Sequence, residues 1–186
     1  MSDTGKKISL AGFALGVLAN IVWFIGFILG NRIISEGDFI SFFCEDAYSV
    51  LMIISLLAIV IGYALKFLDE RDIFYILIAV FTFWTFISLA LPYFGYPISL
   101  GNIYVDRILH NLFLLLIAVN TFRKGNMVFA ALLISAFLFL ALVVPFVNVT
   151  LFYNFSNSLI MIFIAIISVA ELGAFGVAAL SELQER

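Results

Sequence analysis

Residues 8–31 read ISLAGFALGVLANIVWFIGFILGN, an unbroken run without a charged side chain. About 20 mostly apolar residues are enough for an α-helix to cross the ~30 Å hydrocarbon core of a bilayer. The run is longer than the apolar segment of a signal peptide, and no small-residue cleavage motif closes it. It therefore predicts a first membrane-spanning helix that is retained.

Further uncharged runs follow along the chain. The stretch 73–105 is too long for one span, and the sequence PYFGYP at 92–97 interrupts it, because proline and glycine end a helix. The uncharged stretch 125–170 holds two helices, separated by Pro145 and the polar residues after it. We predict an all-α polytopic membrane helix bundle, a single integral membrane domain with six transmembrane helices. The predicted spans are 8–31, 47–66, 73–91, 105–122, 127–146 and 158–180.

The composition supports a membrane protein. Hydrophobic residues make up 65% of the chain and charged residues 11%, whereas soluble domains have roughly 45–50% and 25%. So little polar surface excludes an ordinary soluble domain, and the aromatic content excludes a disordered chain. The net charge of -3 leaves no basic surface for nucleic acid. The expected partner is therefore the lipid bilayer.

Lysine and arginine predict the orientation. With six spans, both termini lie on one side of the membrane, and that side holds seven of the nine basic residues. Because cytoplasmic loops carry an excess of Lys and Arg, both termini are predicted to be cytoplasmic in a multi-pass protein of the cell membrane. The seven are Lys6, Lys7, Lys66, Arg71, Arg123, Lys124 and Arg186, and the two on the outer side are Arg32 and Arg107.

A polar cluster is expected at the outer ends of three helices. Asp106 and His110 are four residues apart, so they share one face of the fourth helix. If the neighbouring helix ends meet there, the cluster is either a site for a cation, a proton or a polar ligand, or an interfacial ion-pair network that orients the helices. The candidate ligand-binding residues are Arg32, Glu45, Asp46, Asp106, Arg107 and His110.

A metal ion in this cluster would take His110, Asp106 and either Glu45 or Asp46, a mixed nitrogen and oxygen set that zinc or a harder ion accepts. His110 is the only histidine, which excludes a centre with several histidines. The sequence identifies no cofactor and no catalytic residue. It also lacks the common motifs H-E-x-x-H, G-x-S-x-G and C-x-x-C, so an enzyme is the less favoured class.

Glu171 is the one acidic residue inside a predicted span. A carboxylate at this depth costs ~2.5–3.5 kcal/mol on insertion scales, so the side chain is expected to face the bundle interior. It is predicted either to couple protons or bind a cation, or to form a hydrogen bond to a neighbouring helix. Asn20, in the middle of the first span, is the candidate partner for that hydrogen bond.

Small residues predict close helix contacts in the first span, where Gly12 and Gly16 are four residues apart. Small side chains let helix backbones approach closely in lipid. This face is expected to pack inside the bundle. The alternative is that a partner subunit or a second copy of the chain docks on the Gly12/Gly16 face.

Two short segments carry a resemblance. Residues 38–41 (DFIS) follow the first span, and residues 108–115 (ILHNLFLL) begin the fourth. With this layout the chain resembles a family of uncharacterised six-span membrane proteins of archaea and bacteria, which implies the fold and no activity. It is also similar in length and span number to the substrate-binding subunits of vitamin-uptake transporters. Those subunits bind ligand near the outer face and dock through alanines on the first helix, where this chain has Gly12 and Gly16.

These observations predict a membrane protein that binds a small ligand or ion at an outer polar site and is associated with transport. One alternative is a structural or accessory subunit of a larger membrane complex. A second is a small lipid-modifying enzyme that uses the outer carboxylates and His110.

Overall fold

The computed structural model describes residues 2–32, 46–96, 98, 100–146 and 157–184. Within them, six helices are long and apolar enough to cross a membrane, which confirms the predicted all-α six-span fold. The fifth span begins as α6 and continues through a π-helical turn, η2, to Phe146. The elements are α1 (Ser2–Arg32), α3 (Tyr48–Glu70), α4 (Ile73–Tyr93), α5 (Ile103–Arg123), α6 (Met127–Leu138), η2 (Phe139–Val143) and α8 (Asn157–Gln184).

Polar side chains cap the helices where the sequence breaks. Asp72 precedes α4 and its carboxylate accepts a hydrogen bond from the backbone N–H of Phe74 at 3.0 Å. Asn102 caps α5 in the same way, accepting from the N–H of Tyr104 at 3.0 Å. Such caps satisfy backbone donors that the first helical turn leaves without partners. The predicted break after the third span is confirmed, because α4 ends at Tyr93.

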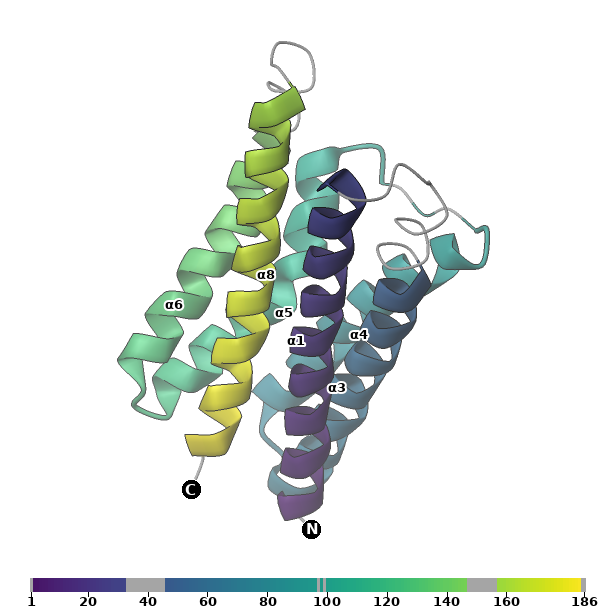
Figure 1. Cartoon of the computed structure of the whole chain (residues 1–186). Helices are drawn as coiled ribbons and strands as arrows, with labels where there is room; N and C mark the ends of the chain where they lie inside the picture. The colour runs from purple at the N-terminus through teal and green to yellow at the C-terminus, as the bar shows by residue number, and fades with distance from the viewer. Residues whose placement is uncertain (1, 33–45, 97, 99, 147–156, 185–186) are drawn as a thin grey trace.

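The six helices close into a ring in which each helix packs against its neighbours in sequence, and α8 returns to α1. Figure 1 shows the start of α1 and the end of α8 at the same end of the bundle. We call this the terminal end and the opposite one the distal end. The distal end is the one predicted to face outward, and that orientation stays a prediction.

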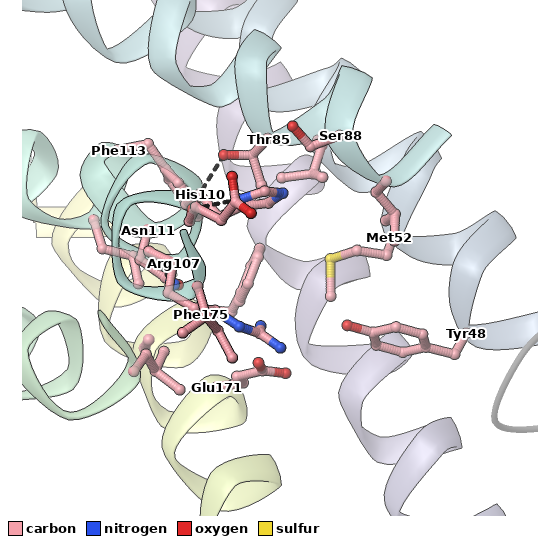
Figure 2. A pocket seen from close by; sticks show the side chains of 17 residues that line it. Tyr48, Met52, Thr85, Ser88, Arg107, His110, Asn111, Phe113, Glu171 and Phe175 are labelled. Atoms are coloured by element: carbon pink, nitrogen blue, oxygen red, sulfur yellow. Dashed lines mark hydrogen bonds between the residues drawn. The ribbon is translucent and has the colours of Figure 1, made fainter. Parts of the chain in front are cut away.

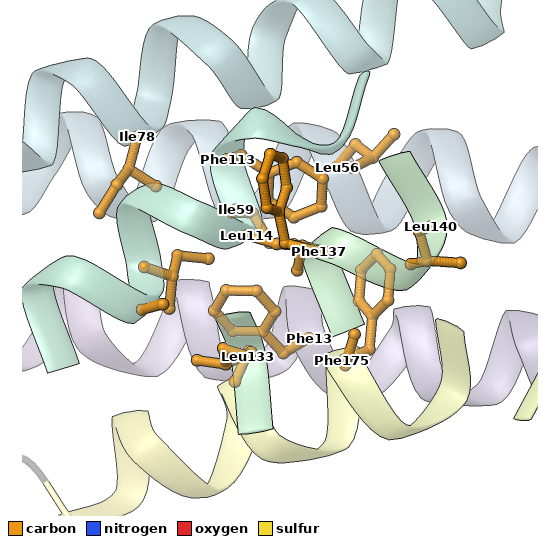
Figure 3. Close-up of a cluster of buried hydrophobic side chains, with 14 of the residues drawn as sticks. Phe13, Leu56, Ile59, Ile78, Phe113, Leu114, Leu133, Phe137, Leu140 and Phe175 are labelled. Atoms are coloured by element: carbon orange, nitrogen blue, oxygen red, sulfur yellow. The ribbon is translucent and has the colours of Figure 1, made fainter. Parts of the chain in front are cut away.

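Aliphatic side chains and a group of aromatic rings fill the middle of the bundle (Figure 3). The ring of Phe175 lies edge-on to Phe13, with centroids 6.3 Å apart, and 6.1 Å from the ring of Phe113. These three rings join α1, α5 and α8. Along α8, Phe175 lies between Glu171 and Glu182, so the apolar cluster separates the polar groups of the two ends.

The two glycines of α1 pack inside the chain. A Cβ atom on Gly12 would lie 2.9 Å from the carbonyl oxygen of Ser55 in α3, and one on Gly16 would lie 2.1 Å from a ring carbon of Phe175 in α8. The face is therefore covered by α3 and α8 of the same chain. A second subunit that docked here would first have to displace one of these helices, and association of the chain with any partner stays a prediction.

Candidate functional site

The first turns of α5 present polar side chains at the distal end. His110 lies one turn after Asp106, and its ring Nδ1 is 2.6 Å from the backbone carbonyl oxygen of Asp106. A carbonyl oxygen only accepts hydrogen bonds, so Nδ1 carries the hydrogen. This leaves Nε2 as the ring atom with a lone pair in neutral His110. The two side chains share one face of α5, as predicted, but His110 contacts the backbone of Asp106, while the Asp106 carboxylate accepts from the N–H of Leu100 at 3.1 Å.

A cavity of about 410 Å³ opens between α3, α4, α5 and α8 (Figure 2). Three of the predicted site residues, Asp106, Arg107 and His110, line it together. Glu171 of α8 lines the same cavity, although the sequence placed it apart from the outer cluster. The chain fold therefore joins two features that appeared separate in the sequence.

Arg107 and Glu171 bring opposite charges to this cavity. In Figure 2 both side chains point into the same space, and Arg107 acts electrostatically on the Glu171 carboxylate. Yet among the described residues no ion pair within 4 Å joins them. Glu171 lies in the middle of α8, so the cavity reaches from the distal end to about half the depth of the bundle.

The predicted hydrogen bond between Asn20 and Glu171 is not formed. Asn20 is buried, and its amide nitrogen donates to the carbonyl oxygen of Gly16 in its own helix at 2.9 Å. In the part of the chain that the structure describes, no hydrogen bond connects Asn20 with Glu171. A side-chain amide one turn from a helix carbonyl finds its acceptor locally, so it does not need the distant carboxylate.

The other predicted site residues do not reach this cavity or cannot be placed. Asp46 is exposed and lines neither this cavity nor the one beside it. Arg32 ends α1, but its side chain lies outside the described part, and Glu45 lies outside the described residues altogether. Where residues are described, no three His, Cys, Asp or Glu side chains gather closely enough to hold a metal ion. The metal set containing Asp46 is therefore not assembled.

Sequence reasoning missed three hydroxyl groups that line the cavity. The hydroxyl of Tyr48 points into it from the start of α3 (Figure 2). Thr85 of α4 donates to the carbonyl oxygen of His110 at 2.6 Å, which ties α4 to α5. Ser88 lies one turn further along α4 and is only 8% exposed, and its Oγ has no hydrogen-bond partner among the residues that the structure describes. Hydroxyl residues in apolar spans are common, so their spacing alone gave no signal.

A second charged group lies at the terminal end, and the sequence analysis did not foresee that its charges pair. Lys66 was counted among the basic residues of the predicted cytoplasmic side, which stays a prediction, and Glu182 lies beyond the predicted sixth span of 158–180. Lys66 is 2% exposed and pairs with Glu182, which is fully buried near the end of α8. Tyr63 donates to the same carboxylate, and Ser9 donates to it at 3.1 Å.

We call Ser9, Tyr63, Lys66 and Glu182 the terminal network. It connects α1, α3 and α8, and the Lys66 ammonium also lies 4.8 Å from the centre of the Tyr63 ring. Every oxygen of the carboxylate has a donor, which is the condition for a buried charge pair to be tolerated. Lys66 lies three residues after Tyr63, so both reach one face of α3, but nothing in the sequence pointed to Glu182 as their partner.

No family model, curated protein or solved structure matches the chain. The class is therefore defined by the fold and its polar groups alone. The structure is that of a multi-pass membrane protein with six apolar helices, a distal cavity with charged walls and a buried terminal network.

Proposed function

We propose that this chain binds a small polar or ionic ligand in the distal cavity, as a transport-associated binding protein of the cell membrane. The observation that carries the proposal is the arrangement of Arg107 and Glu171, which face the same cavity without pairing. Glu171 lies in the middle of the apolar helix α8, where an acid is costly unless a counter-charge or hydrogen-bond donors lie near its carboxylate, and Arg107 is exposed at the distal end of the same cavity. A bound ligand can interact with both side chains.

The other polar groups that line the distal cavity also favour ligand binding. Within the described part of the chain the buried Ser88 hydroxyl has no partner, and leaving such a group unsatisfied costs about 1–3 kcal/mol. His110 presents Nε2, and Tyr48 presents its hydroxyl. A cavity with apolar walls and a few convergent polar groups is the usual form of a small-molecule site. With the predicted orientation, a ligand would enter from the outer side.

The test is native mass spectrometry of the protein extracted gently from its own membrane, with the wild type compared with Arg107→Gln and Glu171→Gln. We expect a bound small mass in the wild type and its loss in both variants. Arg123→Gln is the matched control, because Arg123 lies at the other end of the same helix, α5, and pairs with Asp72 at the surface. It is expected to retain the ligand.

Two results would overturn the proposal. One is a wild type that carries no small ligand, and the other is a bound mass that survives both cavity substitutions. Co-migrating protein partners without a small ligand would favour the accessory-subunit alternative instead.

A further inference from the structure

A second cavity of about 300 Å³ lies beside the first. The two share part of their lining, and the shared residues include both facing charges. A molecule held at these charges therefore has access to space on both sides. The shared residues are Tyr48, Arg107, Asn111, Leu140 and Glu171.

The two cavities differ in chemistry. On its own side, the larger has the hydroxyls of Thr85 and Ser88 together with Asp106 and His110. The smaller has an additional lining that is apolar except for Ser168, whose hydroxyl already donates to the carbonyl oxygen of Ile164 at 2.8 Å. The other apolar residues of the smaller cavity are Trp23, Val144 and Ile167.

One of the elements that line both cavities is a π-helical turn. Leu140 belongs to the π-helical turn η2 and lines both spaces. A π-helical turn inside an α-helix occurs frequently at functional sites. Together, the two cavities fall within the roughly 300–1,000 Å³ typical of pockets that hold drug-sized ligands.

We propose that the ligand is a zwitterionic amphiphile, whose charged head lies between Arg107 and Glu171 and whose single apolar chain occupies the cavity lined by Trp23 and Ile164. This inference rests on the proposed function and names the ligand class. A planar guanidinium binds phosphate or carboxylate through paired hydrogen bonds, and the Glu171 carboxylate is suited to an ammonium group. Arg107 is exposed at the mouth of the cavity and Glu171 is half-buried. A ligand with both groups supplies a counter-charge to each of them, whereas a singly charged one leaves the second without a counter-charge.

The test uses purified protein in detergent and two probes with the same headgroup. Lysophosphatidylethanolamine carries the zwitterionic head and one acyl chain, and phosphoethanolamine carries the head alone. We expect the first to bind at least about tenfold more tightly, because burying each CH₂ group contributes roughly 0.8 kcal/mol. Lysophosphatidylglycerol, which has an anionic head, is expected to bind more weakly than its zwitterionic counterpart.

Two tryptophan variants distinguish binding of the ligand's acyl chain from binding of its headgroup. Ile164→Trp fills the apolar cavity, and Ile166→Trp is the matched control because Ile166 is exposed on the same helix and lines neither cavity. Ile164→Trp is expected to abolish the advantage of the acyl chain while phosphoethanolamine binding is unchanged. Ile166→Trp is expected to change neither, and Arg107→Gln to weaken both.

The outcomes distinguish the two proposals. If the acyl chain gives no advantage or Ile164→Trp has no effect, the amphiphile inference is wrong, and the proposed function stands if a small ligand is still lost in Arg107→Gln. If lysophosphatidylglycerol binds as tightly as its zwitterionic counterpart, the zwitterion assignment is wrong. If the wild type binds no lysophosphatidylethanolamine, the inference fails, while co-purified ligand still tests the proposed function separately.

Discussion

The two ends of the bundle each place an acidic side chain of α8 near a basic one, but they do so differently. At the terminal end, Glu182 contacts Lys66 directly, and hydroxyls complete its hydrogen bonds. At the distal end, Glu171 and Arg107 face a cavity and do not pair. A satisfied pair needs no ligand and holds helices together, whereas a separated pair leaves interactions that a ligand can complete.

The largest expected difference between the two ends appears when the acid at each end is neutralised in turn. Glu182→Gln leaves Lys66 buried without its counter-charge, so we expect the free energy of unfolding to fall by about 3–5 kcal/mol. Glu171→Gln removes a charge that has no direct partner, and stability without ligand should be unchanged or higher. Thermal unfolding in detergent measures both. A double variant, Lys66→Met with Glu182→Leu, should recover much of the loss, and equal effects of the two single changes would contradict the distinction.

The second largest effect is expected from close packing at the terminal end. A Cβ atom on Gly62 would lie 2.5 Å from the backbone nitrogen of Ser9, so Gly62→Ala must push α1 away from α3. Overpacking of this kind costs about 1–3 kcal/mol. Gly173→Ala is the control, because a Cβ there meets nothing within 4 Å. Equal unfolding midpoints for the two variants would contradict this prediction, because they would show that α1 and α3 accommodate the added methyl group without loss of stability.

Alanine substitutions of two buried serines are expected to change the stability by smaller amounts and in opposite directions. Ser55 donates to the carbonyl oxygen of Gly12 at 2.7 Å, so Ser55→Ala should lose about 1 kcal/mol of stability. Ser88 has no partner, so Ser88→Ala should raise the stability of the ligand-free protein by up to about 1 kcal/mol while weakening ligand binding. A loss of stability in both variants would mean that the Ser88 hydroxyl is already satisfied without ligand.

The smallest effect concerns the surface pair of Asp72 and Arg123. Partial burial opposes the charged form of Asp72, but the N–H of Phe74 and the Arg123 guanidinium outweigh it and lower the pKa of this carboxyl. A lowered pKa in the folded state stabilises the protein above the unfolded value, about 3.9, and this stability is lost as the pH falls through the folded value. The loss of folding stability with falling pH, measured by thermal unfolding at a series of pH values, should be smaller in Arg123→Gln than in the wild type. Because the pair is exposed, high salt should also weaken its contribution.

Part of the candidate site followed from the sequence. Asp106 and His110 were predicted to share a face because their spacing matches one helical turn, and local spacing survives folding. The depth of Glu171 likewise predicted an inward-facing side chain. Asp46 lines neither cavity and Asn20 does not bond to Glu171, and both outcomes depend on which neighbouring helix each side chain meets.

The sequence by itself determined the membrane class, the six helices and most of their ends, since these depend on local runs of apolar residues and on capping residues such as Asp72 and Asn102. Only the tertiary structure decided which charges meet. Lys66 and Glu182 are 116 residues apart and form an ion pair, while Arg107 and Glu171, closer in the chain, line one cavity without forming one. The physical reason is that the order of helices around the ring and their rotation come from side-chain packing, such as Phe175 against Gly16, and no local pattern encodes that packing.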